Sequence, residues 1–138
     1  MKPALVDASA LIALFDPADA AHARYTRLLQ AQGAHLRLHS VWPCIVEASH
    51  LLRGAAKYGM LRWIGHGAVQ VFPIDSTDLL EFVPVMQQHS EPPRSSMNLA
   101  DAALYWLAAE TGIHTVMTRD VRDFSRYRLP DGGSFEIL

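Results

Sequence analysis

Four acidic side chains stand where a solvated acid is not expected, and their types point to metal chemistry. Asp7 and Asp120 each lie at the carboxyl end of a short apolar stretch of strand length. Glu47 and Asp101 lie inside apolar helical stretches, at the spacing of a buried helix face. An ionised carboxylate that faces a core is costly unless something compensates its charge. Because ligands of open α/β sheets bind at the carboxyl ends of the strands, Asp7 and Asp120 are expected at one shared site.

A divalent cation is the compensation that this set of acids favours. Arginine pairs or backbone N–H groups could offset single carboxylates, but only a metal explains four of them with no matching number of buried cations. Mg²⁺ and Mn²⁺ prefer hard oxygen ligands and are typically held by a few carboxylates plus a substrate phosphate. Four acids suit one tight site or a pair of sites, as in two-metal phosphodiester hydrolysis. The acids therefore predict a metal-dependent hydrolysis of phosphodiester bonds.

Each acid also has a structural interpretation when it is taken alone. Asp7 could be a turn residue, and Glu47 could pair with a neighbouring arginine. The negative charge of Asp101 could interact favourably with the dipole at the start of its helix, and Asp120 could cap a turn. The combination of residue types, positions and order favours the metal site over these separate explanations.

Short apolar strands separated by helices must position these acids. Strands are predicted at residues 4–6, 36–38, 69–74, 115–117 and 135–138. Helices are predicted at residues 10–15 with Ser9 as cap, 20–32, from Ser40 and Pro43 to about 58–59, 60–64, 79–89 and 98–111. Pro84 is expected to kink or break its helix, and residues 91–96 are expected to form a loop. Strands joined by helical crossovers predict a parallel α/β sheet that is covered on both faces.

Length and composition indicate one folded domain over residues 1–138, with 50% hydrophobic and 19% charged residues. The longest stretch without Asp, Glu, Lys or Arg, residues 63–74, is shorter than the roughly 20 residues of a membrane span. The first residues reach Asp7 too early for a secretory signal, so the expected location is the cytoplasm. A single cysteine, Cys44, excludes an intrachain disulfide and a cysteine-cluster metal site.

The formal net charge of −2 gives no global basic field for nucleic acid. Arginine nevertheless supplies most of the positive charge, and four arginines crowd into the segment 119–128. Because the guanidinium fork binds phosphate with two hydrogen bonds, three arginines close to the last acid are expected to contact phosphate groups of a substrate. These are Arg119, Arg122 and Arg126.

Four segments together resemble a known family. They are Asp7-Ala8-Ser9-Ala10-Leu11-Ile12 after an apolar strand, Val46-Glu47 on a helix, Leu99-Ala100-Asp101-Ala102 opening an apolar helix, and Thr118-Arg119-Asp120-Val121-Arg122-Asp123-Phe124. With these segments the chain resembles the PIN-domain nucleases, and among them the VapC-type toxins. The resemblance extends over essentially the whole chain, and its first and last segments are the most specific.

The resemblance implies a three-layer α/β/α domain with about five parallel strands, which hydrolyses RNA with Mg²⁺ or Mn²⁺. It also implies a homodimer and a cognate antitoxin, so that the chain would be the toxin of a type II toxin–antitoxin pair. The acids of the family match Asp7, Glu47, Asp101 and Asp120. Of these, Asp7, Asp101 and Asp120 are expected to contact metal. The resemblance also assigns supporting positions to Ser9, Thr118 and Asp123.

Three alternatives stay open on the sequence. The chain could be a solitary RNA-processing nuclease of the same family, or a catalytically silent PIN-like module that binds RNA or protein without metal. A third alternative is a phosphatase with a strand-end aspartate as nucleophile, similar to haloacid-dehalogenase-like enzymes. Those enzymes have a second aspartate two residues on, where this chain has Ser9.

Overall fold

Five parallel strands form one sheet in the order β3-β2-β1-β4-β5. The computed structural model describes residues 1–90 and 96–138. The strands are β1 (Lys2–Val6), β2 (Leu36–Val41), β3 (Val69–Phe72), β4 (Thr115–Met117) and β5 (Glu136–Ile137). In the central strand, Leu5 pairs with His39 on one side and with Val116 on the other. The predicted parallel sheet of about five strands is confirmed.

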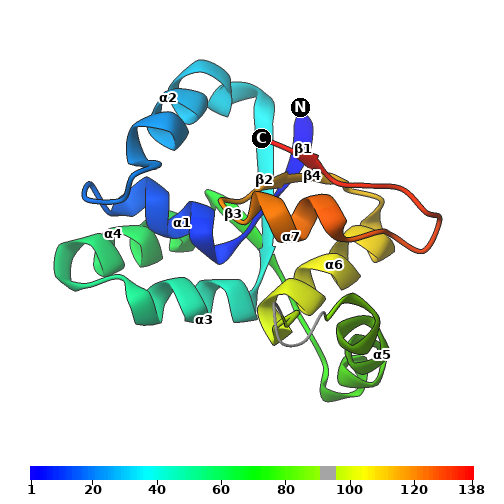
Figure 1. Cartoon of the computed structure of the whole chain (residues 1–138). Coiled ribbons are helices and arrows are strands. Elements are labelled where there is room, and N and C mark those ends of the chain that lie inside the picture. Colours follow the sequence, from blue (N-terminus) through cyan, green and yellow to red (C-terminus); the bar gives the residue numbers. More distant parts are fainter. Residues whose placement is uncertain (91–95) are drawn as a thin grey trace.

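Helices cover both faces of this sheet, as the three-layer prediction requires. They are α1 (Ala8–Phe15), α2 (His22–Gln32), α3 (Trp42–Leu51), α4 (Gly54–Gly65), α5 (Leu79–His89), α6 (Leu99–Thr111) and α7 (Val121–Arg126), with short 3₁₀ turns η1 (Gly33–His35) and η2 (Ser76–Asp78). With the usual handedness of parallel crossovers, this strand order implies that α1 to α4 cover one face and α5 to α7 the other. Figure 1 shows these two groups on opposite sides of the strands.

The core lies along the central strand and α6. Leu5 and Val6 of β1 are fully buried, and eight residues of α6 are buried as well. The Asn98 side chain accepts a hydrogen bond from the Asp101 N–H at 2.8 Å and so caps α6. At its other end α6 stops at Gly112, whose φ of 76° is left-handed. Both ends of α6 are thereby defined, which fixes the position of Asp101 at the sheet edge.

The chain between β2 and β3 differs from its prediction. A helix up to residues 58–59 was expected, but α3 ends at Leu51 and α4 begins at Gly54. Leu52 between them is extended, with ψ 153°, and its side chain is buried. Gly54 has a φ of 54°, which glycine adopts without a steric penalty. Burial of Leu52 and this glycine together explain why the helix breaks here.

Two serine hydroxyls expected to cap helices bind elsewhere. Asp7, not Ser9, is the N-cap of α1, and its carboxylate accepts from the Ala8 N–H at 2.8 Å. The helix after β2 has Val41 as its N-cap, without a side-chain hydrogen bond. The Ser40 hydroxyl instead donates to the Val6 carbonyl at 2.8 Å and joins β2 to β1. The Ser40 hydroxyl therefore binds the neighbouring strand β1 instead of capping the start of α3.

Pro84 lies inside α5, which is not broken there. Proline removes one hydrogen bond, to the carbonyl of Leu80. Leu80 is 77% exposed, so water can solvate that carbonyl. Packing also stabilises α5, because its Phe82 is buried and the Phe82 ring lies 5.8 Å from that of Trp106 in α6. The loop expected at residues 91–96 lies, except for its last residue, outside the described residues.

Cys44 is fully buried in α3, and its thiol lies 3.8 Å from the Ala100 carbonyl oxygen. Burial raises the pKa of this thiol well above its usual range, which keeps it protonated and unreactive.

No helix in residues 1–90 or 96–138 combines the length and the apolar character needed to cross a bilayer.

Candidate active site

One small pocket at the carboxyl edge of the sheet contains the four acidic residues that the sequence indicates as metal or catalytic residues. Asp7, Glu47, Asp101 and Asp120 all line it, and its volume is about 140 Å³. Asp7 follows β1 and Asp120 follows β4, while Glu47 comes from α3 and Asp101 from α6. Their burial differs from the expectation. Asp7 and Asp101 are buried at 4% and 5% exposure, but Glu47 is half-buried and Asp120 is exposed.

Asp7 is the most firmly held of these acids. Its Oδ1 accepts from the Ala8 N–H, and its Oδ2 accepts from the hydroxyls of Thr118 at 2.8 Å and Ser9 at 3.0 Å. Thr118 Oγ1 also accepts from the Asp120 N–H at 2.9 Å. The hydroxyl of Thr118 therefore links the acid after β1 to the acid after β4. Ser9 therefore contacts Asp7, and Thr118 contacts both Asp7 and the backbone of Asp120.

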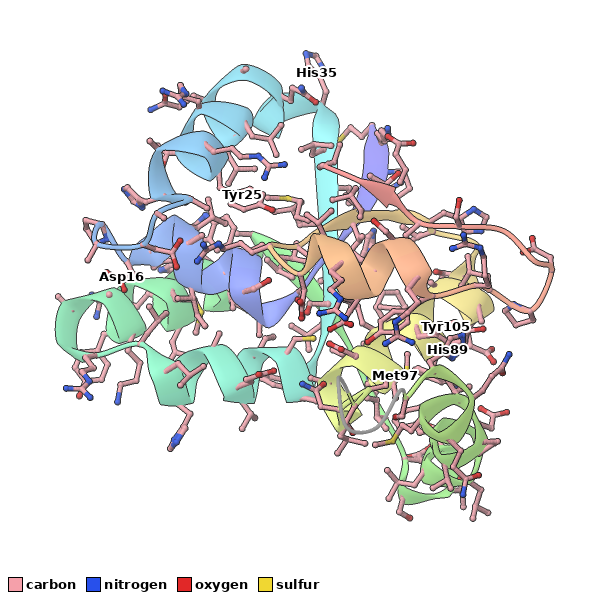
Figure 2. All side chains as sticks on the ribbon, in the orientation of Figure 1. Asp16, Tyr25, His35, His89, Met97 and Tyr105 are labelled. Atoms are coloured by element: carbon pink, nitrogen blue, oxygen red, sulfur yellow. The ribbon has the colours of Figure 1, made fainter. Side chains whose placement is uncertain are left out.

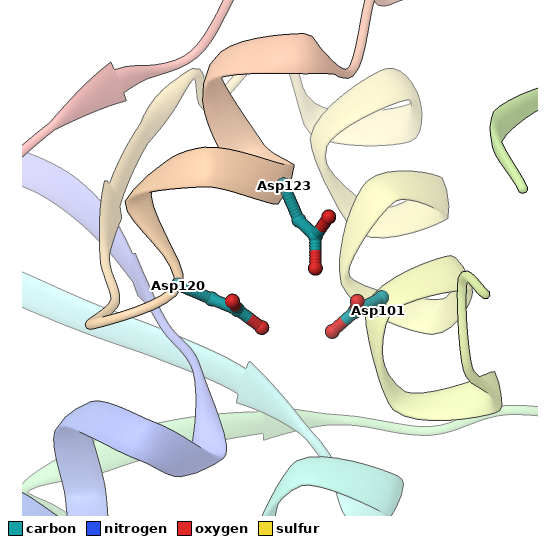
Figure 3. A group of neighbouring side chains, drawn as sticks. All are labelled: Asp101, Asp120 and Asp123. Carbon is teal, nitrogen blue, oxygen red and sulfur yellow. The ribbon is translucent and has the colours of Figure 1, made fainter. Parts of the chain in front are cut away.

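Three aspartates offer carboxylate oxygens that lie within 4.8 Å of one another. They are Asp101 of α6, Asp120 of the β4–α7 turn and Asp123 of α7. Figure 3 shows their carboxylates directed toward a common space. Asp123 was expected only to support the site, and Asp7 was expected among the ligands. In the described residues it is Asp123, rather than Asp7, that joins Asp101 and Asp120 in this group. An all-carboxylate donor set fits a hard cation such as Mg²⁺ or Mn²⁺.

Tyr127 is a contact of the site that sequence reasoning missed. Its hydroxyl donates to Asp101 Oδ2 at 2.8 Å, and its side chain is fully buried. A single tyrosine beyond the last acidic segment carries no motif that would indicate such a bond. The only possible signal was its place close to Asp123, directly after the α7 segment.

Burial raises the pKa of all four sequence-selected acids. The pKa of Asp101 rises to about 7, first because of burial and then because of the nearby Asp7 charge. Burial also raises the pKa of Glu47 and Asp120, and neighbouring carboxylates add to both shifts. For Asp7, hydrogen bonds from Thr118 and Ser9 partly oppose the effect of burial on its pKa. A cation in this pocket would restore the ionised form of these groups.

The three arginines expected to bind phosphate have different surroundings. Arg119 donates to Asp19 Oδ2 at 2.9 Å and lines a recess of about 230 Å³ that also contains Asp120. Arg122 is exposed on the first turn of α7. Arg126 contacts the His89 carbonyl, Asp123 at 3.3 Å and the face of the Tyr127 ring. The Arg126 guanidinium is thus engaged in packing the site.

Comparison with known proteins agrees with this geometry. The PIN domain family model matches residues 4–129. Ribonuclease VapC26 of Mycobacterium tuberculosis (strain ATCC 25618 / H37Rv) is 27% identical over 139 residues, which cover 97% of this chain and 98% of that protein. The crystal structure of M. tuberculosis VapC20, described as a Sarcin-Ricin loop cleaving toxin, superposes with a TM-score of 0.74.

That superposition covers 87% of this chain and 92% of VapC20 at 18% sequence identity, so it concerns the fold. The family model spans nearly the whole chain, including every acidic residue described above for the site. The resemblance seen in the sequence is therefore confirmed, and the chain belongs to the PIN domain family.

Proposed function

We propose that this chain is a metal-dependent endoribonuclease and the toxin of a type II toxin–antitoxin pair. The observation that carries the proposal is the group of carboxylate oxygens from Asp101, Asp120 and Asp123 within 4.8 Å of one another. This group adjoins Asp7 and Glu47 in a PIN domain pocket. The names of VapC26, a ribonuclease, and of VapC20, a toxin, support the reaction and the biological role. The proposal includes a cytoplasmic location, where the RNA of the cell is translated.

Each residue of the site has a different proposed role in hydrolysis. Asp101, Asp120 and Asp123 would hold Mg²⁺ or Mn²⁺, and Asp7 adds negative charge from the buried side. When bound, such an ion supplies positive charge to the scissile phosphate and lowers the pKa of the attacking water. Glu47 is half-buried with a raised pKa, so its carboxylate is suited to accept the proton of that water. Arg119 and Arg122 would bind flanking phosphates.

Single-turnover cleavage of total RNA tests this function directly. We expect cleavage with Mg²⁺ or Mn²⁺ and none in EDTA. Cleavage that persists in EDTA would reject a metal mechanism. RNA binding without cleavage under any metal condition would instead support the catalytically silent module. A phosphatase would release inorganic phosphate from phosphomonoesters and leave internal RNA bonds intact.

Arg122→Ala should weaken RNA binding more than it slows the chemical step. Arg122 is exposed on α7, between Asp120 and Asp123 in the sequence, and we propose that it binds an RNA phosphate. Removing one phosphate-binding cation lowers the slope of log Kd against log salt by about 0.7 for a single strand. Fluorescence anisotropy over a salt series measures this slope. Arg37→Ala is the control, because Arg37 is exposed near the amino end of β2, away from the pocket. Equal slopes for both variants would contradict the assignment.

Two protein partners complete the proposal, a second copy of the chain and an antitoxin. An apolar groove of about 690 Å³, which includes the exposed side chains of Trp42 and Val46, shares Glu47 and Asn98 with the acidic pocket. An antitoxin segment with apolar residues followed by an arginine would fit both the groove and the acids. We expect the product of a small neighbouring gene to copurify with the chain and to inhibit cleavage, and Trp42→Glu to abolish both effects.

Light scattering of the isolated chain at micromolar concentration tests the homodimer. A monomer that is also not toxic on expression would favour the solitary nuclease.

A further inference from the structure

We propose that Tyr127 is a positioning residue that orients the Asp101 carboxylate toward the metal. The inference rests on the proposed function, since it assigns Asp101 to a metal site. Tyr127 holds one oxygen of this carboxylate and so fixes the orientation of the carboxylate, which offers a ligand atom within 4.8 Å of those of Asp120 and Asp123.

The geometry of the contact is specific. The Tyr127 hydroxyl donates to Asp101 Oδ2 at 2.8 Å, and both side chains are buried, at 0% and 5% exposure. The contact joins the segment after α7 to the first turn of α6, where the Asn98 cap fixes the backbone of Asp101. With its backbone held by the cap, the Asp101 carboxylate can still rotate about its Cβ–Cγ bond. The phenol removes that freedom.

The Tyr127 ring is itself held by its neighbours. The rings of Phe124 and His89 lie 5.2 Å and 5.4 Å from it in edge-on contacts, and the Arg126 guanidinium lies 5.1 Å above its face. The Tyr127 N–H also donates to the Asp123 carbonyl at 3.1 Å. The phenol is therefore directed at Asp101 by packing that does not depend on the hydroxyl.

A buried tyrosine needs an acceptor in any case, so the structural role must be separated from the positioning role. Tyr105 provides the matched comparison. It is also buried, its ring lies 5.2 Å from the same His89, and its hydroxyl donates to the Arg128 carbonyl at 2.6 Å. Figure 2 shows Tyr105 beside His89. Its hydroxyl therefore satisfies a backbone group, whereas that of Tyr127 contacts a site carboxylate.

The experiment compares Tyr127→Phe with Tyr105→Phe. Each variant lacks one buried hydroxyl of the same aromatic cluster, and thermal unfolding in EDTA is expected to show similar, modest losses of stability. Mn²⁺ binding, measured from the electron paramagnetic resonance signal of free Mn²⁺, is expected to weaken about 10-fold or more in Tyr127→Phe, as for other groups that orient metal ligands. Tyr105→Phe is expected to bind Mn²⁺ like the wild type.

A double-mutant cycle tests whether the effect passes through Asp101. In an Asp101→Asn background, Tyr127→Phe is expected to cause little further loss of Mn²⁺ affinity. Unchanged Mn²⁺ affinity in Tyr127→Phe, or an equal loss in Tyr105→Phe, would overturn the positioning role while the nuclease proposal stands. A wild-type protein that binds no Mn²⁺ and cleaves no RNA would overturn both.

Discussion

Asp101→Asn is expected to reduce single-turnover RNA cleavage by about 10²–10³-fold while the protein still folds. A metal ion contributes several kcal/mol of transition-state stabilisation, and each 1.36 kcal/mol corresponds to about a factor of ten in rate. Asparagine keeps the shape of the side chain and an oxygen that can accept from Tyr127. It removes one ligand charge from the group with Asp120 and Asp123.

The same substitution should increase the stability of the metal-free protein at pH 8. At that pH the buried Asp101 carboxylate is ionised although burial raises its pKa to about 7. Replacing this charge by a neutral amide should raise the free energy of unfolding by roughly 1–3 kcal/mol. Urea unfolding in EDTA measures this gain. Asp131→Asn, at an exposed turn, is the control and should change neither rate nor stability. An Asp101→Asn variant as fast as the wild type would contradict the metal site.

The metal-free protein should lose stability as pH rises from about 4 to about 7. The pKa of Asp101 is raised in the folded state, so in this range the folded chain binds more protons than the unfolded chain. Asp7, Glu47 and Asp120 have raised pKa values as well, and their contributions have the same sign. Ionisation of the pocket above pH 7 therefore opposes folding until a cation binds.

Mn²⁺ should consequently stabilise the protein more at pH 8 than at pH 5. A ligand present at about 100 times its Kd adds about 2.7 kcal/mol, which raises Tm by roughly 5–10 °C in a domain of this size. Thermal unfolding at both pH values, with Mn²⁺ or EDTA, measures the shift. Asp101→Asn should flatten the pH dependence and reduce the shift. Equal Tm values with Mn²⁺ and with EDTA at pH 8 would count against a metal-binding pocket.

Local sequence determined the elements and the edge of the sheet that carries the site. Apolar stretches of strand length that alternate with helices left a parallel sheet as the consistent arrangement. Asp7 directly follows β1 and Asp120 lies three residues after β4, and parallel strands end at the same edge, so the sequence predicts both acids at that edge. The fold adds that β1 and β4 are neighbouring strands. The ends of α6 were also predictable, because Asn98 and Gly112 have local conformational reasons for their positions.

Tertiary packing decided what depends on neighbours distant in sequence. Burial of Leu52 contributes to the break between α3 and α4, and packing of Phe82 against Trp106 helps to keep α5 unbroken around Pro84. The hydrogen bond from Tyr127 to Asp101 joins residues 26 positions apart, and no sequence pattern indicates it. Likewise, only the folded chain shows that Asp123 faces Asp101 and Asp120. Periodicity specifies which face of an element a carboxylate occupies, but the distance between two carboxylates depends on how the elements pack.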